Sequence, residues 1–260
     1  MPTVDWNKEQ WGEKTDWSQA GGGWSDAWGG PEMQWYGSIL PRIRRLVPCG
    51  TILEIAPGFG RWTHFLKDVC ERLIIVDLVP KCIEACRARF ADCDHIVYHV
   101  NDGRSLDMVP DDSVDFVFSF DSLVHVQPQV IESYVSQFPR LLKSSGHTFL
   151  HHSNLGNYAA YRQLSSIPLL RKFLQKVRIL ERNTHNRDPE VTSDMMQSIA
   201  RKHGLSCLTQ EVVNWHTRAA LIDCLTVLHK GENSGTKAWK NNNFMKEAGL
   251  IKRMGEIYAF

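Results

Sequence analysis

The sequence predicts an α/β fold with a doubly wound, mostly parallel seven-stranded sheet. Apolar, strand-like segments alternate along the chain with segments of helical period, and several of the strand-like segments are apolar on both faces. Buried strands of this kind are typical of a parallel sheet that carries helices on both sides. The length of 260 residues suits one such domain with additions.

The elements are expected in the following order. Residues 1–30 are rich in Gly, Trp and polar side chains without a sustained period, which indicates an irregular segment. Pro31 suits the first turn of a helix that continues to about Leu46. Strands are expected at 51–55, 72–76, 95–100, 114–120, 146–152, 205–215 and 220–229, the last two antiparallel. Helices are expected at 61–69, 80–90, 131–142, 193–203 and from about 243.

Two regions stand out from the alternating pattern. Residues 1–48 form a Trp-rich segment and helix before the main domain at 49–260, and six of the nine Trp fall in the first 35 residues. Residues 153–190 follow the fifth strand and are rich in Arg and Lys, with an apolar helical period. This insertion is either a helix with a solvated basic face or a cap over a substrate.

Composition and charge exclude several classes. The 30 Lys and Arg balance 29 Asp and Glu, whereas a general nucleic-acid binder needs a basic excess. The N-terminus shows no secretory signal, and no apolar run approaches the ~20 residues of a membrane span. Seven Cys fit a reduced, cytoplasmic protein. Cys82 and Cys86 lie one helical turn apart, but no second pair completes a metal site.

The first strand leads into a glycine-containing turn. The segment Glu54-Ile-Ala-Pro-Gly58-Phe-Gly60 connects the strand to a helix, and its glycines permit a tight turn and close approach of a ligand. The free N–H groups of the following helix favour a negative ligand group. The spacing differs from the G-x-G-x-x-G pattern, which argues against a dinucleotide-dependent dehydrogenase.

This turn and the acids after the next strands resemble the motifs of class I S-adenosylmethionine (SAM)-dependent methyltransferases. Ala56 stands where that family usually has the first glycine of acidic-x-Gly-x-Gly-x-Gly. The resemblance implies that Asp77 holds the ribose hydroxyls and that Asp102 receives the adenine amino group. It also implies that Asp121-Ser-Leu-Val-His125 lies near the methionine end and the reacting methyl.

The cofactor implied by the resemblance is SAM, with S-adenosylhomocysteine as the product. The residues expected to bind it are Glu54, Ala56, Pro57, Gly58, Gly60, Trp62, Asp77, Leu78, Asp102, Gly103, Arg104, Phe120 and Asp121.

The candidate catalytic residues are Asp121, His125 and His152. Methyl transfer requires an oriented acceptor, and an oxygen acceptor also needs a base. His151 and His152 end the fifth strand and point to opposite faces, so only one faces the cleft, and we favour His152. His125 is either catalytic or packs near SAM. A divalent metal on Asp121, His125 and a strand-five His is not favoured, because Val124 stands where the quinone-precursor branch of the family has an acid.

The Trp-rich segment is expected to cover the acceptor through Trp24, Trp28 and Trp35, since aromatic faces suit sugars, flat rings and cations. The other N-terminal Trp residues fit packing or mobile positions. The basic insertion suits a polar or anionic small molecule.

The function expected from the sequence is SAM-dependent methylation of a small molecule, at a hydroxyl oxygen of a sugar or secondary metabolite. One alternative is N-methylation of an amine or an RNA base, and another is SAM binding without catalysis. Phe120-Asp121-Ser122-Leu123 replaces the Asn/Asp-Pro-Pro-aromatic motif of nucleic-acid N-methylating relatives, which disfavours the base. Acceptor identity and oligomeric state stay open.

Overall fold

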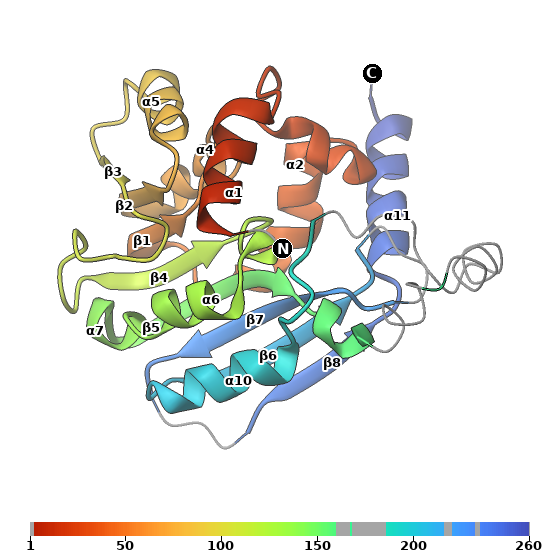
Figure 1. The fold of residues 1–260 in the computed structure, drawn as a ribbon. Helices are drawn as coiled ribbons and strands as arrows, with labels where there is room; N and C mark the ends of the chain where they lie inside the picture. Colours follow the sequence, from red (N-terminus) through yellow and green to blue (C-terminus); the bar gives the residue numbers. More distant parts are fainter. Residues whose placement is uncertain (1–2, 160–166, 168–185, 216–219, 232–234, 260) are drawn as a thin grey trace.

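A single sheet forms the centre of the molecule in a computed structural model that describes residues 3–159, 167, 186–215, 220–231 and 235–259. The sheet has eight strands in the order β3-β2-β1-β4-β5-β7-β6-β8 (Figure 1). Strands β1 to β5 are parallel to one another, whereas β7 lies antiparallel between β5 and β6. The predicted α/β class with a mostly parallel sheet is confirmed.

The sheet has one strand more than the seven expected. Its strands are β1 Cys49–Ile55, β2 Cys70–Asp77, β3 Ile96–Val100, β4 Val114–Ser119, β5 Leu142–Ser153, β6 Ser206–Val213, β7 Asp223–His229 and β8 Lys237–Asn241. The extra strand, β8, pairs parallel with β6 at the edge of the sheet, and most of its residues are exposed. An edge strand needs no buried face, so its sequence lacks the apolar pattern that marks the other strands.

The helices lie in two layers on either side of the sheet. They are α1 Val4–Glu9, α2 Pro31–Gln34, α3 Leu40–Ile43, α4 Thr63–Leu66, α5 Pro80–Arg89, α6 Pro128–Val135, α7 Phe138–Leu141, α10 Ser193–Lys202 and α11 Phe244–Ile257. Short 3-10 or π-helical turns are η1 Gln10–Lys14, η2 Gly22–Trp28, η3 Trp35–Ile39, η4 Lys67–Val69, η5 Leu123–His125 and η6 Leu155–Tyr158.

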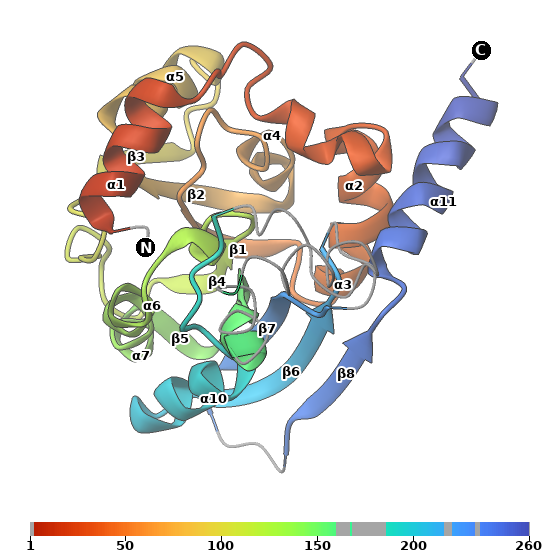
Figure 2. The same cartoon turned by 45° about the vertical axis from the view of Figure 1, so that its right-hand side comes forward.

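Each strand contributes side chains to two cores, because successive residues point to opposite faces. Ile52 and Phe118 pack with α2 to α5 and α11 in one core. Leu53 and Val117 pack with α6, α7 and α10 in the other. Figure 2 shows α11 beside α2 and α3, next to the edge strand β8. The strands β1, β2 and β4 are therefore packed on both faces, and these two cores hold their carboxyl ends in place.

The N-terminal segment is more regular than the sequence predicts. It forms α1, η1 and η2 where an irregular segment is expected, and the Thr3 hydroxyl caps α1 by accepting a bond from the Trp6 N–H at 3.1 Å. Trp28 and Trp35 are buried in the same core as the strands, so the described part of the N-terminal segment shares a core with the sheet. Their expected role in acceptor binding is wrong, since both rings stabilise the core.

The helix expected from Pro31 to Leu46 is divided into α2, η3 and α3. Pro41 has no N–H to donate to the preceding turn, and the π-helical turn η3 stands just before it. Most of the expected insertion at 153–190 lies outside the described residues, so its role as a cap stays a prediction. Among the residues that the structure describes, no helix is long and apolar enough to cross a membrane.

Candidate cofactor and acceptor pocket

The turn between β1 and α4 forms one wall of a cavity of about 540 Å³ at the carboxyl ends of β1, β2 and β4. Ala56 and Gly58 line the cavity, and both have left-handed backbones with φ of +59°. A Cβ on Gly58 would approach the Trp17 ring to 2.7 Å. The glycine thus allows an aromatic side chain to pack directly over the turn.

Gly60, the second glycine of the motif, supports the turn from behind. Its φ is +82°, and an added Cβ would lie 2.5 Å from the ring of Phe90. Gly60 is absent from the cavity lining among the described residues, so the structure gives it a packing role rather than the expected contact with the cofactor.

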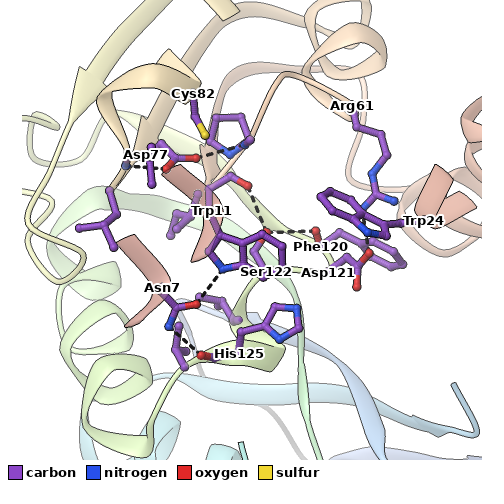
Figure 3. A pocket seen from close by; sticks show the side chains of 18 of the residues that line it. Asn7, Trp11, Trp24, Arg61, Asp77, Cys82, Phe120, Asp121, Ser122 and His125 are labelled. Carbon is purple, nitrogen blue, oxygen red and sulfur yellow. Dashed lines mark hydrogen bonds and ion pairs between the residues drawn. The ribbon is translucent and has the colours of Figure 1, made fainter. Parts of the chain in front are cut away.

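Asp77 lies at the end of β2 and faces the cavity (Figure 3). One carboxylate oxygen accepts a bond from the Gly58 N–H at 3.1 Å and the other from the Val79 N–H at 2.8 Å. Burial raises the pKa of Asp77 to about 6, although these N–H groups oppose the shift. Each oxygen keeps lone-pair capacity for a further donor such as a sugar hydroxyl.

Glu54 does not reach the cavity. It is 1% exposed, and it accepts a bond from the Thr63 hydroxyl at 2.6 Å, which ties β1 to α4. Burial raises the pKa of Glu54 to about 8, so the carboxyl is mostly protonated at neutral pH. The expectation that Glu54 contacts the cofactor is therefore corrected to a structural role.

The loop after β3 contributes only Gly103 of its predicted residues. The carboxylate of Asp102 accepts bonds from the N–H groups of Arg104 at 2.8 Å and Ser105 at 2.6 Å. Asp102 and Arg104 are exposed and are not part of the cavity lining. The structure uses Asp102 to close a turn, as short acids commonly do, and does not bring its carboxylate to the cavity.

Asp121 follows β4 with a φ of +62° and faces the cavity opposite Asp77 (Figure 3). Its Oδ2 accepts a bond from Arg61 Nη2 at 2.8 Å, and Arg187 Nη2 lies 3.9 Å from Oδ1. Burial alone would raise the pKa of Asp121, but the two guanidinium groups outweigh burial and lower it. Asp121 is therefore an ionised carboxylate in the wall of the cavity.

His125 lies one turn after Asp121 and also lines the cavity. Its Nδ1 is 3.1 Å from the carbonyl oxygen of Asn186, and its own carbonyl accepts a bond from the Asn7 amide at 2.9 Å. Burial lowers the pKa of His125 to about 4, and Arg187 adds to the effect. The imidazole is therefore neutral at physiological pH and a weak base.

The prediction that His152 faces the cleft is wrong. Its ring lies on the opposite face of β5, where Nε2 is 2.8 Å from the Thr226 hydroxyl and Nδ1 is 2.8 Å from the Ser153 carbonyl. His151 occupies the other face, packed against the rings of Phe120 and Trp215. His151 lies behind the cavity wall and contacts the main chain of Asp121.

Aromatic rings from the N-terminal segment cover the cavity, but they differ from those expected. Trp24 lines it as predicted, together with Trp11 and Trp17. Trp17 stacks on Phe59 with ring centroids 4.6 Å apart, and its indole N–H donates to the Trp11 carbonyl at 2.7 Å. Trp11 lies 5.0 Å from the His125 ring. We call residues 11–24 the aromatic strap.

Sequence reasoning missed part of the charged lining. Arg61 directly follows the second glycine of the motif, and that position was the one available signal for it. Its guanidinium lies 5.3 Å from the Trp24 ring and 4.6 Å from the Trp62 ring. Arg187 and Trp215 also line the cavity. Arg187 belongs to the basic insertion at 153–190, whose Arg and Lys were expected to meet an anionic acceptor, whereas no sequence pattern predicted Trp215.

The lining residues are suited to SAM. Asp77 can accept bonds from ribose hydroxyls, and the rings of the aromatic strap suit a sulfonium cation. The predicted cofactor residues found in the lining are Ala56, Pro57, Gly58, Trp62, Asp77, Leu78, Gly103, Phe120 and Asp121. The described residues contain no group of three or more His, Cys, Asp or Glu side chains that could hold a metal ion.

Comparison with known proteins identifies the fold. Residues 52–146, from β1 to β5, match a family model described as a methyltransferase domain. The chain has the fold of class I SAM-dependent methyltransferases. A SAM-dependent methyltransferase structure from Mesorhizobium loti is similar with a TM-score of 0.51 and 16% identity, over 76% of this chain and 97% of that chain.

Two curated relatives match part of the chain. Nodulation protein S of Bradyrhizobium diazoefficiens is 37% identical over 65 residues, which cover 25% of this chain and 31% of the relative. Phosphoethanolamine N-methyltransferase 1 of Triticum aestivum is 29% identical over 118 residues, which cover 44% of this chain and 24% of the relative. The matches thus span a third or less of each relative's length.

Proposed function

We propose that the protein transfers the methyl group of SAM to a small-molecule acceptor held beside Asp121. The observation that carries this proposal is the arrangement of two carboxylates, buried Asp77 and largely buried Asp121, across one cavity. Asp77 lies at one side of the cavity next to the glycine turn, and Asp121 lies at the other next to Arg61 and Trp24 (Figure 3). One side suits the sugar of the cofactor, and the other suits a polar acceptor.

The residues of the chain would act mainly by binding and orientation. SAM, when bound, supplies an electrophilic methyl group on its sulfonium sulfur. Asp77 would accept bonds from the ribose hydroxyls, and the rings of Trp17 and Trp24 would exclude water from the reacting centre. Alignment of the acceptor with the methyl group is the main task, because orientation alone supplies a large share of such a rate.

An amine is the acceptor that the described residues support best. Asp121 is ionised and can accept a hydrogen bond from an amine N–H, which orients the nitrogen lone pair. An amine in its neutral form needs no base before attack, and His125, with a pKa of about 4, is a weak base. The wheat relative named as an N-methyltransferase agrees with this proposal.

A hydroxyl oxygen of a sugar or secondary metabolite is the second candidate. His125 favours it because the imidazole lines the cavity and is neutral at physiological pH, so the ring can accept a proton. The guanidinium groups of Arg61 and Arg187 would suit an anionic metabolite. A hydroxyl has to lose its proton during the reaction, whereas a neutral amine does not need a base before attack. The oxygen acceptor is therefore the second candidate and the amine the first.

The proposal is tested by binding and transfer measurements on the full chain. Calorimetry should show SAM and S-adenosylhomocysteine binding, and methyl-labelled SAM should label acceptors from a panel of small amines and polyols. Gly58→Ala should weaken SAM binding, because the new Cβ would displace the Trp17 ring. Gly204→Ala is the matched control, since Gly204 has a similar φ of +75° with no atom within 4 Å of an added Cβ.

Three outcomes would change the proposal. NADH binding without SAM binding would overturn it. SAM binding with no transfer to any acceptor would favour a non-catalytic SAM-binding protein. Labelling of polyols but not amines would replace the amine with the oxygen acceptor.

A further inference from the structure

A closed ring of buried polar groups lies behind Asp121. The backbone N–H of Asp121 donates to His151 Nδ1 at 3.1 Å, and His151 Nε2 lies 3.0 Å from Asp223 Oδ2. The guanidinium of Arg187 donates from Nε to Asp223 Oδ1 at 3.0 Å and from Nη2 to Oδ2 at 2.8 Å. Arg187 Nη2 is also 3.9 Å from Asp121 Oδ1, which returns the ring to its starting residue.

The ring defines one tautomer of His151. Its Nδ1 accepts the Asp121 N–H and therefore carries no proton, so the proton is on Nε2 and is donated to Asp223. The side chains of His151 and Asp223 are fully buried, so water does not compete for these bonds. Rotation of the imidazole would leave the Asp121 N–H and the Asp223 carboxylate without these partners, which is unfavourable in a buried site.

The ring joins segments that are far apart in the sequence. Asp121 follows β4, His151 lies on β5, and Asp223 begins β7. Burial alone would raise the pKa of Asp223, but Arg187 and His151 outweigh burial and hold it well below its ordinary value. The ion pair between Asp223 and Arg187 thus anchors the segment that contains Arg187 to the sheet.

Asp121 has a backbone conformation that needs this support. Its φ of +62° is uncommon for a residue with a side chain, although Asp tolerates it better than most. The His151 bond holds the Asp121 N–H, and the guanidinium groups of Arg61 and Arg187 flank its carboxylate. Both the main chain and the side chain of Asp121 are therefore held by buried partners.

We infer that His151, Asp223 and Arg187 are positioning residues that fix the direction of the Asp121 carboxylate toward the acceptor. The inference rests on the proposed function, in which Asp121 binds the acceptor. These residues act through Asp121, and none of the three is assigned a contact with the reacting atoms. A merely structural ring would contribute to stability alone, so the two roles differ in their effect on acceptor kinetics.

The test compares His151→Phe with His152→Phe in the full chain. Both histidines are fully buried neighbours on β5, but only His151 belongs to the ring. His151→Phe keeps an aromatic ring between Phe120 and Trp215 and removes both nitrogens. It should lower kcat/KM for the acceptor by about 10- to 100-fold, as expected for a misplaced group, with SAM affinity nearly unchanged. His152→Phe should leave kcat/KM nearly unchanged.

Two further measurements keep the inference testable if His151→Phe fails to fold. His151→Asn retains an acceptor for the Asp121 N–H and should recover part of the lost kcat/KM. Long-range ¹H–¹⁵N spectra of the wild-type chain should show His151 with its proton on Nε2. A proton on Nδ1 would overturn the ring, and equal kcat/KM in His151→Phe and the wild type would overturn the positioning role.

Failure of this inference is distinguishable from failure of the proposed function. A wild-type chain that transfers no methyl group overturns the proposed function and, with it, the positioning role. The His151 tautomer still shows in that case whether the ring exists. A fully active His151→Phe variant overturns the positioning role and leaves the proposed function intact.

Discussion

Replacing Asp77 with Asn is expected to weaken SAM binding by about 10- to 150-fold. The substitution keeps the size of the side chain but exchanges a carboxylate oxygen for an amide NH₂, which cannot accept a hydrogen bond from a ribose hydroxyl. A hydrogen bond to a charged group contributes about 1.5–3 kcal/mol. At 1.4 kcal/mol for each tenfold change in affinity, this loss gives the stated range.

The pH dependence of binding provides a second measurement on the same residue. With a pKa of about 6, Asp77 is mostly ionised at pH 7.5 and mostly protonated at pH 5 in the free protein. The ionised form is the better acceptor, so wild-type SAM affinity should fall as the pH decreases through 6. Asp77→Asn has no carboxylate at this position and should lack this part of the pH dependence.

Calorimetry at pH 7.5 and pH 5 is the assay, with Asp102→Asn as the matched control. Asp102 is exposed and lies outside the cavity lining, so its substitution should change SAM affinity by less than about threefold. Asp77→Asn also disturbs an acceptor of the Gly58 or Val79 N–H, so a decrease in Tm of about 2–4 °C per kcal/mol lost is expected. Wild-type affinity in Asp77→Asn, or a larger effect in Asp102→Asn, would refute the reasoning.

Two further predictions concern the aromatic strap and the buried histidine. Trp17→Ala removes the stack on Phe59 and the indole bond to Trp11, so SAM affinity should fall about tenfold by calorimetry, while Trp239→Ala on exposed β8 should leave it unchanged. Equal affinities would exclude a role for the strap. His152 has a pKa of about 4, lowered from 6.5, so below pH 6.5 the unfolded chain binds a proton that the folded chain does not. Because of this linkage, the free energy of unfolding of the wild type decreases by about 2 kcal/mol when the pH is lowered from 7.5 to 5. The stability deficit of His152→Gln in urea unfolding should therefore shrink by that amount, and an equal deficit at both pH values would contradict the burial of His152.

The fold and the side of the cavity that holds Gly58 and Asp77 could be predicted because their signals are local. The strand, the glycine turn and the acid after β2 are short patterns, and Gly58 and Asp77 lie where those patterns place them. Glu54 and Asp102 belong to the same patterns, yet their carboxylates bond to Thr63 and to a turn. A motif identifies a position in the chain, whereas the direction of its side chain depends on neighbours that the motif does not contain.

The choice between His151 and His152 shows a second limit. Alternation predicts that the two rings point to opposite faces, but it does not say which face holds the cavity. Phe149 and Leu150 precede them and are both buried, so neither face of β5 is marked as polar. The pairing of β4 with β5 also shifts register between Val114 and Phe116, so counting residues along β5 does not predict which residue of β4 each one faces.

The remaining errors come from contacts between distant segments. Trp28 and Trp35 are nearer in sequence to β1 than Trp11 and Trp17, yet the first pair lies in the core and the second lines the cavity. Arg187 reaches the cavity through an insertion whose path no local pattern specifies. Each of these placements depends on contacts between segments that are far apart in the sequence, and a local pattern does not contain those contacts.

The packing of Trp17 on Gly58 bears on the order of events in a catalytic cycle. The strap covers the turn beside which SAM is proposed to bind, so we expect cofactor exchange to require the strap to lift from Phe59 and Gly58. Departure of the spent cofactor would then depend on the opening of residues 11–24, and that motion would set the turnover rate when methyl transfer is faster. The tryptophans of the aromatic strap would in this way limit the rate of cofactor exchange, and a change in their fluorescence would report the opening of the strap.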